Sequence, residues 1–282
     1  MRSSQTSSAR ELLRAFRATH AIRTHVIGGH SWDVIAGGSG EPPLVLLPAA
    51  GGSAESQFHV IDRFEKRARV LSIGCPATLT RVSDAVTGIH AILDDAGVQS
   101  CNLLGQSLGG IFAQAYASAF PERVEGLILA NTARYSTRRA RIFRMALSSA
   151  QHLPRNAVAA MLGARLKQLL HGNPDRDFWL EYFGRDEFER LGTRGIANRG
   201  ACIADSVRRD DGPRYAGRTL IIESDNDTGF TAAERQAFRE SYPQAKVCVF
   251  RGAGHLSSIS RCDEFVAEVV GFMEQSQSPV PR

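Results

Sequence analysis

Short runs of apolar residues recur along the chain and predict the strands of a mostly parallel sheet. Most of these runs are continuous, which is typical of strands that are buried on both faces. Near the start, apolar and polar residues alternate instead, in two stretches separated by two glycines that indicate a hairpin. The predicted strands are residues 24–27, 32–35, 44–47, 70–73, 100–104, 126–130, 219–222 and 246–250.

Segments with the 3.6-residue period of amphipathic helices lie between these strands. The predicted helices are residues 56–67, 82–96, 108–120, 231–242 and 263–275. Strand and helix therefore alternate, an order that predicts right-handed crossovers with helices on both faces of one sheet. We expect an α/β fold with a mostly parallel central sheet.

One long segment interrupts this alternation. From about residue 134 to residue 215 the apolar residues keep a helical spacing, and no convincing strand is present. An insertion of this length is too long for a structureless loop inside a compact domain. The expected organisation is a tail and short helix at 1–20, a core at 21–132 and 216–276, a helical cap at 133–215 and a disordered tail at 277–282.

The segment around Ser107 carries the strongest chemical signal. Gly105, Ser107 and Gly109 form a Gly-x-Ser-x-Gly pattern between a predicted strand and a predicted helix. In that context the serine lies on a sharp strand-to-helix turn, which exposes its hydroxyl at the edge of the sheet. The bare pattern is weak, but this context makes Ser107 a candidate nucleophile.

A serine hydroxyl needs an oriented base to act as a nucleophile near neutral pH. His255 follows the last predicted strand in a Gly-Ala-Gly-His sequence, whose glycines allow the loop to bring the imidazole to Ser107. The acid that orients this imidazole is expected just beyond an earlier strand, where Asp225 and Asp227 both lie. We choose Asp227 because it stands further from the predicted strand end, and Asp225 remains the alternative.

Acyl transfer also needs two backbone N–H groups that stabilise the oxyanion. Leu108, the residue after the candidate nucleophile, is expected to supply one from the start of a helix. The second is expected from the Gly-rich loop after residues 44–47, and its position points to Ala50. The residues expected to contact the substrate are Gln106, Ala49, Phe178 and Trp179. The last two belong to an aromatic cluster whose main expected role is to pack the cap.

Composition is that of an ordinary globular protein, with 43% hydrophobic and 22% charged residues. No apolar run approaches the roughly 20 residues that cross a bilayer. The basic, Ser-rich start is more typical of a frayed tail than of a transit peptide. The five cysteines are odd in number and widely spaced, which favours a reducing compartment, and we expect the cytoplasm. No cluster has metal-ligand spacing, so neither a metal nor a cofactor is expected.

The net charge of +5 is unevenly distributed. Between Ala133 and Tyr215 the chain has 16 Arg or Lys residues against 9 Asp or Glu, and five of these arginines lie within residues 134–144. A solvated outer helix face is the simplest interpretation. The alternative is a surface that attracts an acyl carrier, a phosphorylated or other anionic ligand, or an acidic lipid surface. Nothing in this context indicates nucleic-acid binding.

These landmarks together resemble the α/β-hydrolase fold superfamily over residues 26–272. Within it the chain is most similar to the maspardin-type branch, through residues 16–20, the Pro-Ala-Ala-Gly-Gly-Ser loop and residues 240–245. Some members of that branch have an incomplete triad and act as binding proteins, whereas this chain keeps an obvious His255 and an acid. The same loop is similar to that of thioesterases that serve polyketide and peptide assembly lines.

The residues and the resemblance together predict a cofactor-independent serine hydrolase that cleaves a small carboxylic ester or thioester through an acyl-enzyme. One alternative is a non-catalytic, maspardin-like adaptor or ligand-binding protein. Another is an acyl-carrier thioesterase of a biosynthetic pathway. Cofactor-free haloperoxidase and C–C bond hydrolase chemistry use the same triad and therefore also remain open.

Overall fold

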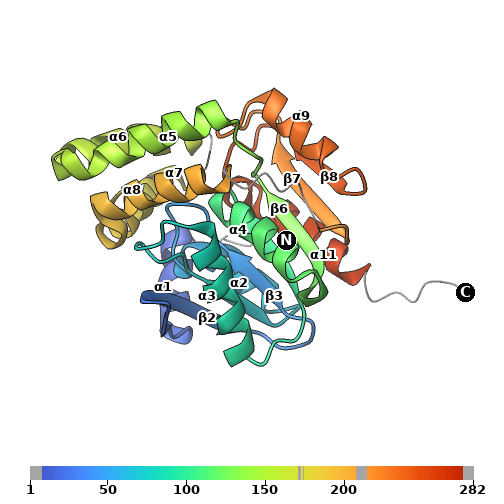
Figure 1. Cartoon of the computed structure of the whole chain (residues 1–282). Coiled ribbons are helices and arrows are strands. Elements are labelled where there is room, and N and C mark those ends of the chain that lie inside the picture. Colours follow the sequence, from blue (N-terminus) through green and yellow to red (C-terminus); the bar gives the residue numbers. More distant parts are fainter. Residues whose placement is uncertain (1–7, 171–172, 174, 208–214, 276–282) are drawn as a thin grey trace, which may run out of the picture.

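The computed structural model describes residues 8–170, 173, 175–207 and 215–275. Within them one eight-stranded sheet has the order β1-β2-β4-β3-β5-β6-β7-β8 (Figure 1). β2 pairs antiparallel with β1 and with β4, and every later pairing is parallel. The strands are β1 (Arg23–Ile27), β2 (His30–Gly37), β3 (Leu44–Leu47), β4 (Val70–Ile73), β5 (Cys101–Gln106), β6 (Val124–Ala130), β7 (Thr219–Ser224) and β8 (Lys246–Phe250).

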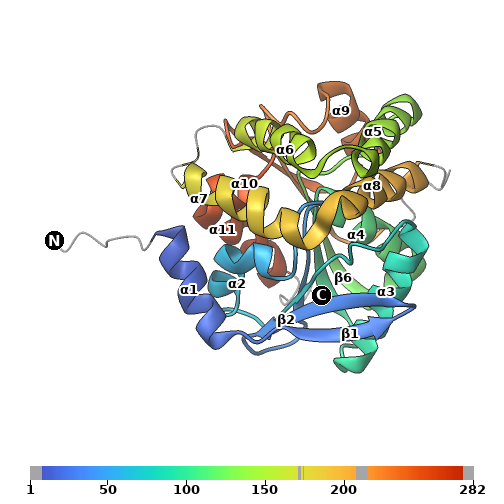
Figure 2. The same cartoon turned by 90° about the vertical axis from the view of Figure 1, so that its left-hand side faces the viewer.

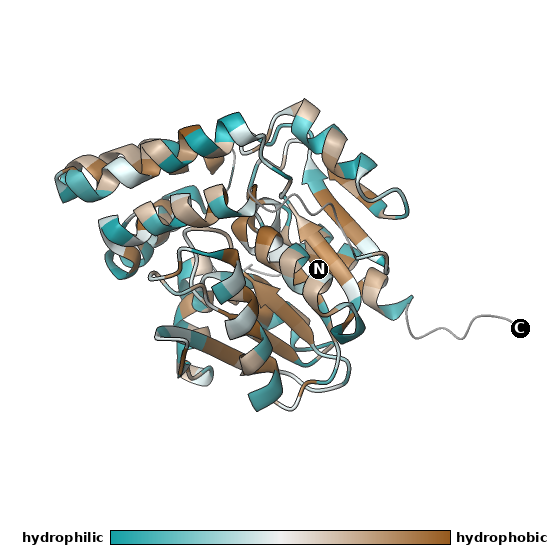
Figure 3. Cartoon of the chain, in the orientation of Figure 1, coloured by the Kyte–Doolittle hydropathy of each residue, from teal (hydrophilic) through white to brown (hydrophobic). Residues whose placement is uncertain are grey.

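Helices cover both faces of the sheet (Figures 1 and 2). They are α1 (Ala9–Thr19), α2 (Phe58–Phe64), α3 (Val82–Asp95), α4 (Leu108–Ala119), α9 (Ala232–Glu240), α10 (Ser257–Ser260) and α11 (Cys262–Glu274). Because successive strand residues point to opposite faces, each central strand contributes to two cores. Val45 and Leu47 of β3 pack with α3, α4 and α9, whereas Leu44 and Leu46 pack with α1, α2 and α11. Figure 3 shows the resulting apolar strands between helices of mixed polarity.

The described chain between β6 and β7 forms helices, which we call the helical segment. They are α5 (Thr137–Ser149), α6 (Arg155–Leu169), α7 (Arg176–Glu181), a π-helix (Tyr182–Glu187) and α8 (Phe188–Ser206). A break in α8 falls at Gly192, whose φ of 65° is the left-handed conformation that glycine readily adopts. Hydrogen bonds from Arg199 of α8 to the loops that follow β3 and β4 attach this segment to the carboxyl edge of the sheet.

The predicted α/β architecture is confirmed, and the differences lie at element ends. Three strands continue further than their apolar runs, β2 to Gly37, β5 to Gln106 and β7 to Ser224. The helix predicted for residues 56–67 is a short 3-10 helix followed by α2, which ends at Phe64. It ends there because Arg67 and Ala68 both donate to the Phe64 carbonyl in a turn that leads into β4. The tail predicted at 277–282 lies outside the described residues.

The helix predicted near the start of the chain is α1. Ser8 caps it in a reciprocal capping box with Glu11, which satisfies two N–H groups that a helix start leaves unpaired. Arg17 forms a bidentate ion pair with Glu55, and Arg10 forms an ion pair with Glu181 of α7. These contacts join α1 both to the loop after β3 and to the helical segment.

All five cysteines are free thiols, and Cys75, Cys101 and Cys202 are buried. Burial raises the pKa of Cys101 and of Cys202 to about 12, so these thiols stay protonated and serve as small apolar groups. No helix in the described part of the chain has the length and hydropathy to cross a bilayer.

Candidate active site

Ser107 occupies a strained turn between β5 and α4. Its φ of 53° and ψ of −113° are rare for a residue with a side chain. The turn is held because Ser107 N–H donates to Ala130 of β6 at 3.0 Å and the Thr132 hydroxyl donates to the Ser107 carbonyl at 2.8 Å. A backbone strained in this way and fixed by its neighbours is typical of a functional serine.

The flanking glycines allow this turn to pack closely. A Cβ on Gly105 would lie 2.3 Å from the Gly109 carbonyl oxygen, and one on Gly109 would lie 2.2 Å from the Leu47 carbonyl oxygen. Both distances are far inside van der Waals contact, and the atoms that would be struck belong to rigid backbone. The two glycines of the sequence pattern are therefore needed for the approach of α4 to β3 and β5.

A chain of hydrogen bonds connects Ser107 to His255 and Asp227. His255 Nε2 lies 3.0 Å from Ser107 Oγ, and His255 Nδ1 lies 2.8 Å from Asp227 Oδ1. All three residues are less than a tenth exposed. An ionised carboxylate can only accept a hydrogen bond, so Nδ1 carries the hydrogen and Nε2 presents a lone pair to the serine hydroxyl. The arrangement has the geometry of an activated nucleophile.

The structure brings Asp227, and not Asp225, to the imidazole. Asp225 instead accepts a hydrogen bond at 2.8 Å from Gly252 N–H in the loop that carries His255. The neighbouring Asn226 accepts one at 2.7 Å from Gly254 N–H. The two residues before Asp227 thus hold the histidine loop, while Asp227 contacts the ring.

Several hydrogen bonds keep Asp227 ionised although it is buried. Burial alone would raise the pKa of its carboxyl group. The hydrogen bond with His255, the Gly229 N–H at 2.6 Å and the Asn131 amide at 3.1 Å outweigh that effect and hold the pKa below the ordinary 3.8. An anionic Asp227 fixes the histidine tautomer and stabilises the imidazolium that forms when His255 accepts a proton.

Asn131 is a site residue that sequence reasoning missed. It follows β6 with a φ of 44°, and its amide donates to Asp227, to Ser224 Oγ and to the Gly254 carbonyl. Asparagine tolerates positive φ better than most residues, so an Asn immediately after a buried strand was the available signal. Its amide joins the ends of β6 and β7 to the histidine loop.

The two predicted oxyanion donors lie on separate elements. Leu108 is the first residue of α4, and N–H groups in the first turn of a helix have no acceptor within it. Ala50 lies in the half-buried loop after β3, where Gly52 N–H donates to the Ala49 carbonyl at 2.9 Å. Gln106 is only 4% exposed, and its side-chain oxygen accepts a hydrogen bond from Ser258 of α10. That contact ties Gln106 to the protein interior.

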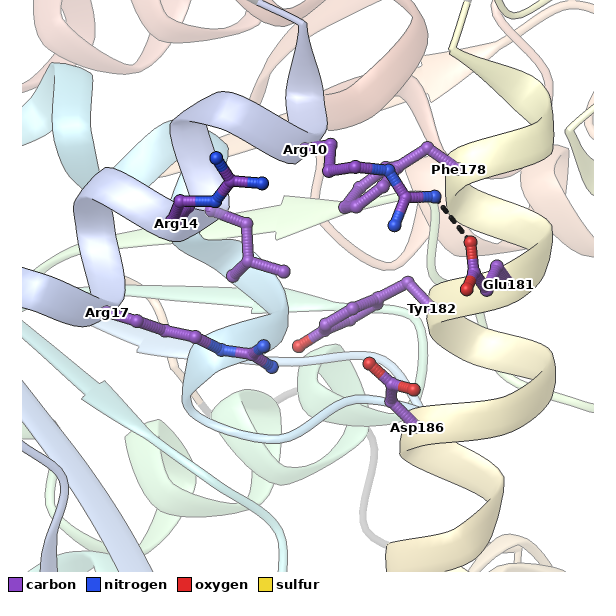
Figure 4. A pocket seen from close by; sticks show the side chains of 8 residues that line it. Arg10, Arg14, Arg17, Phe178, Glu181, Tyr182 and Asp186 are labelled. Carbon is purple, nitrogen blue, oxygen red and sulfur yellow. Dashed lines mark hydrogen bonds and ion pairs between the residues drawn. The ribbon is translucent and has the colours of Figure 1, made fainter.

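The two aromatic residues predicted to contact the substrate pack against α2 and border a pocket beside α1. Trp179 is 2% exposed, and its ring lies 5.3 Å from that of Phe58 and 4.9 Å from that of His59, both in α2. Phe178 borders a pocket of about 260 Å³ between α1 and the helical segment (Figure 4). That pocket is lined by Arg10, Leu13, Arg14, Arg17, Phe178, Glu181, Tyr182 and Asp186. Ser107, Asp227 and His255 are not among its lining residues.

Other aromatic side chains lie next to the histidine. The Phe230 ring is 6.0 Å from that of His255, and Tyr135 packs on Phe230 with ring centroids 4.7 Å apart. Phe230 is buried, and burial raises the pKa of Tyr135 to about 12, so its phenol stays neutral. These two rings form an apolar wall on one side of the triad.

Gly229 allows His255 to reach its observed position. A Cβ on Gly229 would lie 2.4 Å from His255 Nδ1, so we expect Gly229→Ala to displace the ring. A displacement of about 1 Å in a reacting group lowers kcat by roughly 100-fold. The control is Gly271→Ala in α11, where nothing lies within 4 Å of the added methyl group. Steady-state kinetics on both variants test this, and equal kcat values would show that the ring position is not critical.

Comparison with known proteins agrees with this architecture. The family model described as alpha/beta hydrolase fold matches residues 42–261. A proline iminopeptidase of Lactobacillus helveticus is 23% identical over 86% of this chain and 94% of its own length. A 2-hydroxy-6-oxononadienedioate/2-hydroxy-6-oxononatrienedioate hydrolase of Paraburkholderia phymatum is 32% identical, but the match spans 33% of this chain and only 36% of that relative.

Solved structures share the fold over most of the chain. The enol-lactonase from Burkholderia xenovorans LB400 has a TM-score of 0.78 with 20% identity, covering 89% of this chain and all of its own. An esterase from Exiguobacterium antarcticum has a TM-score of 0.76 with 17% identity, covering 89% of this chain and 98% of its own. With the strand-to-helix turn at Ser107 and the matched family model, this chain belongs to the alpha/beta hydrolase fold family.

Proposed function

We propose that the protein is a cofactor-independent serine hydrolase that cleaves a small carboxylic ester or thioester. The observation that carries this proposal is the chain from Ser107 Oγ to His255 Nε2 at 3.0 Å and from His255 Nδ1 to Asp227 Oδ1 at 2.8 Å. A serine hydroxyl placed between an imidazole oriented by a carboxylate and a helix start is equipped for acyl transfer.

In the proposed mechanism, Ser107 Oγ attacks the acyl carbonyl carbon while His255 Nε2 takes the hydroxyl proton. The N–H groups of Leu108 and Ala50 stabilise the oxyanion of the tetrahedral intermediate. The intermediate collapses, and the departing alcohol or thiol takes its proton from His255. A water molecule then gives a proton to His255 and attacks the acyl-enzyme, which releases the acid and restores Ser107.

The substrate class rests on the site and on the named neighbours. The wall formed by Phe230 and Tyr135 suits an apolar acyl group. Solved structures of this fold include an enol-lactonase and an esterase, and both names refer to the cleavage of carboxylic esters. A panel of 4-nitrophenyl esters and matched thioesters with two to eight acyl carbons tests the proposal. We expect saturable hydrolysis with an initial burst of leaving group.

The same panel addresses the maspardin-like binding-protein alternative. A folded protein that binds these compounds, but releases neither alcohol nor thiol, would contradict the hydrolase proposal. In that case the site around Ser107 would act in recognition alone.

An acyl-carrier substrate is a second candidate because of the charge of the helical segment. Residues 131–174, which follow β6, contain eight Arg or Lys residues and no Asp or Glu. The structure refines which cations are accessible: Arg139 is tied to Glu234, to the Gly229 carbonyl and to two aromatic rings. Arg138, Arg141 and Arg144 are exposed on α5. We infer that these three arginines would receive the acidic surface of an acyl carrier protein.

Neutralising this surface should change the response to salt. We expect Arg138→Gln, Arg141→Gln and Arg144→Gln together to lower kcat/KM for a carrier-bound thioester by about tenfold at low salt. Small esters should be unaffected. The control removes the same charge from the exposed arginines Arg23, Arg67 and Arg81. If the triple variant and the wild type show the same salt dependence of kcat/KM, α5 is not the docking surface.

A further inference from the structure

Arg199 of α8 is a buried cation whose known partners are all main-chain carbonyls. It is 2% exposed. Its Nε donates to Ala50 at 2.9 Å, Nη1 to Pro76 at 2.8 Å and Nη2 to Cys75 at 2.7 Å. The described residues place no carboxylate within ion-pair distance of it. Burying a guanidinium without a counter-ion is costly, so its hydrogen bonds to these loops are needed to keep it in place.

Arg199 acts on the turn that contains the proposed oxyanion donor. The hydrogen bond from Gly52 N–H to the Ala49 carbonyl closes a four-residue turn with Ala50 and Gly51 at its centre. That bond fixes the peptide unit that includes Ala50 N–H. Arg199 fixes the next unit by binding the Ala50 carbonyl, and Gly51 lacks the positive φ that the alternative type II turn would require. The peptide units on both sides of Ala50 are thus held.

The far end of the same loop is held by a second residue of the helical segment. Glu187 is 4% exposed, and its carboxylate accepts hydrogen bonds from both the N–H and the hydroxyl of Ser53. It also accepts from Tyr182 at 2.9 Å and from Arg190 at 2.9 Å. Figure 2 shows the chain from α7 to α8 running across the molecule above α2 and α4. The loop that follows β3 is therefore attached to the helical segment at two points.

Building on the serine hydrolase function proposed above, we propose that Arg199 and Glu187 are positioning residues for the oxyanion hole. The position of Leu108 N–H is fixed by the start of α4, which packs within the core. Ala50 N–H lies on a Gly-rich loop whose geometry depends on these two contacts with the helical segment. The second half of the oxyanion hole therefore forms only while the helical segment is docked on the sheet, which couples its position to catalysis.

Replacing Arg199 should separate kcat from KM. We expect Arg199→Met to lower kcat by about 100-fold, which is the usual cost of losing one oxyanion donor, while KM changes less than about threefold. The matched control is Arg218→Met. Arg218 also donates to a main-chain carbonyl, that of Phe272, but it precedes β7 at the opposite edge of the sheet. Adding guanidinium ion to Arg199→Ala should restore part of kcat, because the free ion can bind the same three carbonyls.

Two further measurements keep the test decisive. Hydrogen exchange at the 50–53 amides should be faster in Arg199→Met than in wild type and unchanged in Arg218→Met, and this readout does not require turnover. If Arg199→Met does not fold, Ser53→Ala removes one contact to Glu187 and should lower kcat by about tenfold. Wild-type exchange, or wild-type kcat in the folded variants, would overturn the positioning role. A wild-type protein without hydrolytic activity would refute the proposed function alone, and exchange would still decide on the loop.

Discussion

Replacing Ser107 by alanine should abolish nearly all hydrolysis, with a fall in kcat of roughly 10⁴- to 10⁶-fold and little change in KM. The reason is that Ser107 Oγ, 3.0 Å from His255 Nε2, is the atom that forms the acyl-enzyme. Among the residues that the structure describes, no other hydroxyl bonds this nitrogen. The variant keeps the oxyanion donors, so a small residual rate above that of water is expected. Initial rates on the best ester of the panel measure the effect.

The control for this experiment is Ser100→Ala. Ser100 lies just before β5, at the end of the strand opposite Ser107, and its hydroxyl bonds Glu125. Ser100→Ala also removes a serine hydroxyl next to β5 but leaves the triad intact. We therefore expect kcat to stay within about twofold of wild type. If Ser107→Ala kept more than a tenth of the wild-type rate, the acyl-enzyme mechanism would be wrong.

The second large effect is expected for Asp227→Asn, with a fall in kcat of about 10⁴-fold. Unlike a carboxylate, an amide at this position can donate a hydrogen bond to His255 Nδ1. The imidazole then adopts the tautomer that leaves Nε2 protonated and unable to accept from Ser107. Asp225→Asn is the matched control, because Asp225 bonds Gly252 N–H and does not contact the ring. Equal losses in the two variants would reject the assignment of Asp227 as the orienting acid.

Asp227 also links stability to pH. Its pKa is lower in the folded protein than the ordinary 3.8, so the folded state binds this proton less readily than the unfolded chain does. The resulting stabilisation is complete above about pH 4 and is lost as the pH falls through the folded-state pKa. Urea unfolding at about pH 5 and about pH 3 should therefore show a smaller loss of stability with acid in Asp227→Asn than in wild type.

The strands and the triad candidates were predictable because their signals are local. Continuous apolar runs mark strands buried on both faces, and β3, β4 and β8 begin and end where those runs do. The turn at Ser107 depends on glycines within two residues of it, so the pattern and the backbone strain are encoded together. The choice of Asp227 over Asp225 followed from distance along the chain, and the structure places Asp227 against the ring.

The contacts that position the site were not predictable in this way. Arg199 bonds the carbonyl of Ala50, which lies 149 residues earlier, and main-chain acceptors carry no sequence signature. Asn131 bonds the end of β7, the loop that carries Asp227 and the histidine loop, and these segments meet only in the folded protein. Both roles arise from tertiary packing of distant segments.

The aromatic and basic side chains of the helical segment show the same limit. Helical periodicity predicted helices there, but it did not predict which neighbouring element each helix face contacts. Trp179 packs on Phe58 of α2, and Phe178 borders the pocket beside α1. Arg139 looked like one member of a uniform basic cluster, yet it pairs with Glu234 of α9. Only the orientation of each helix distinguishes these residues from their exposed neighbours.

The most direct test of the central claim is covalent labelling with a fluorophosphonate, which reacts with activated serine hydroxyls. The purified wild type should label at a single residue, identified as Ser107 by peptide mass spectrometry. Ser107→Ala and His255→Ala should fail to label although both remain folded. A folded wild type that does not label, or labelling that persists in Ser107→Ala, would contradict a nucleophile activated by His255 and Asp227.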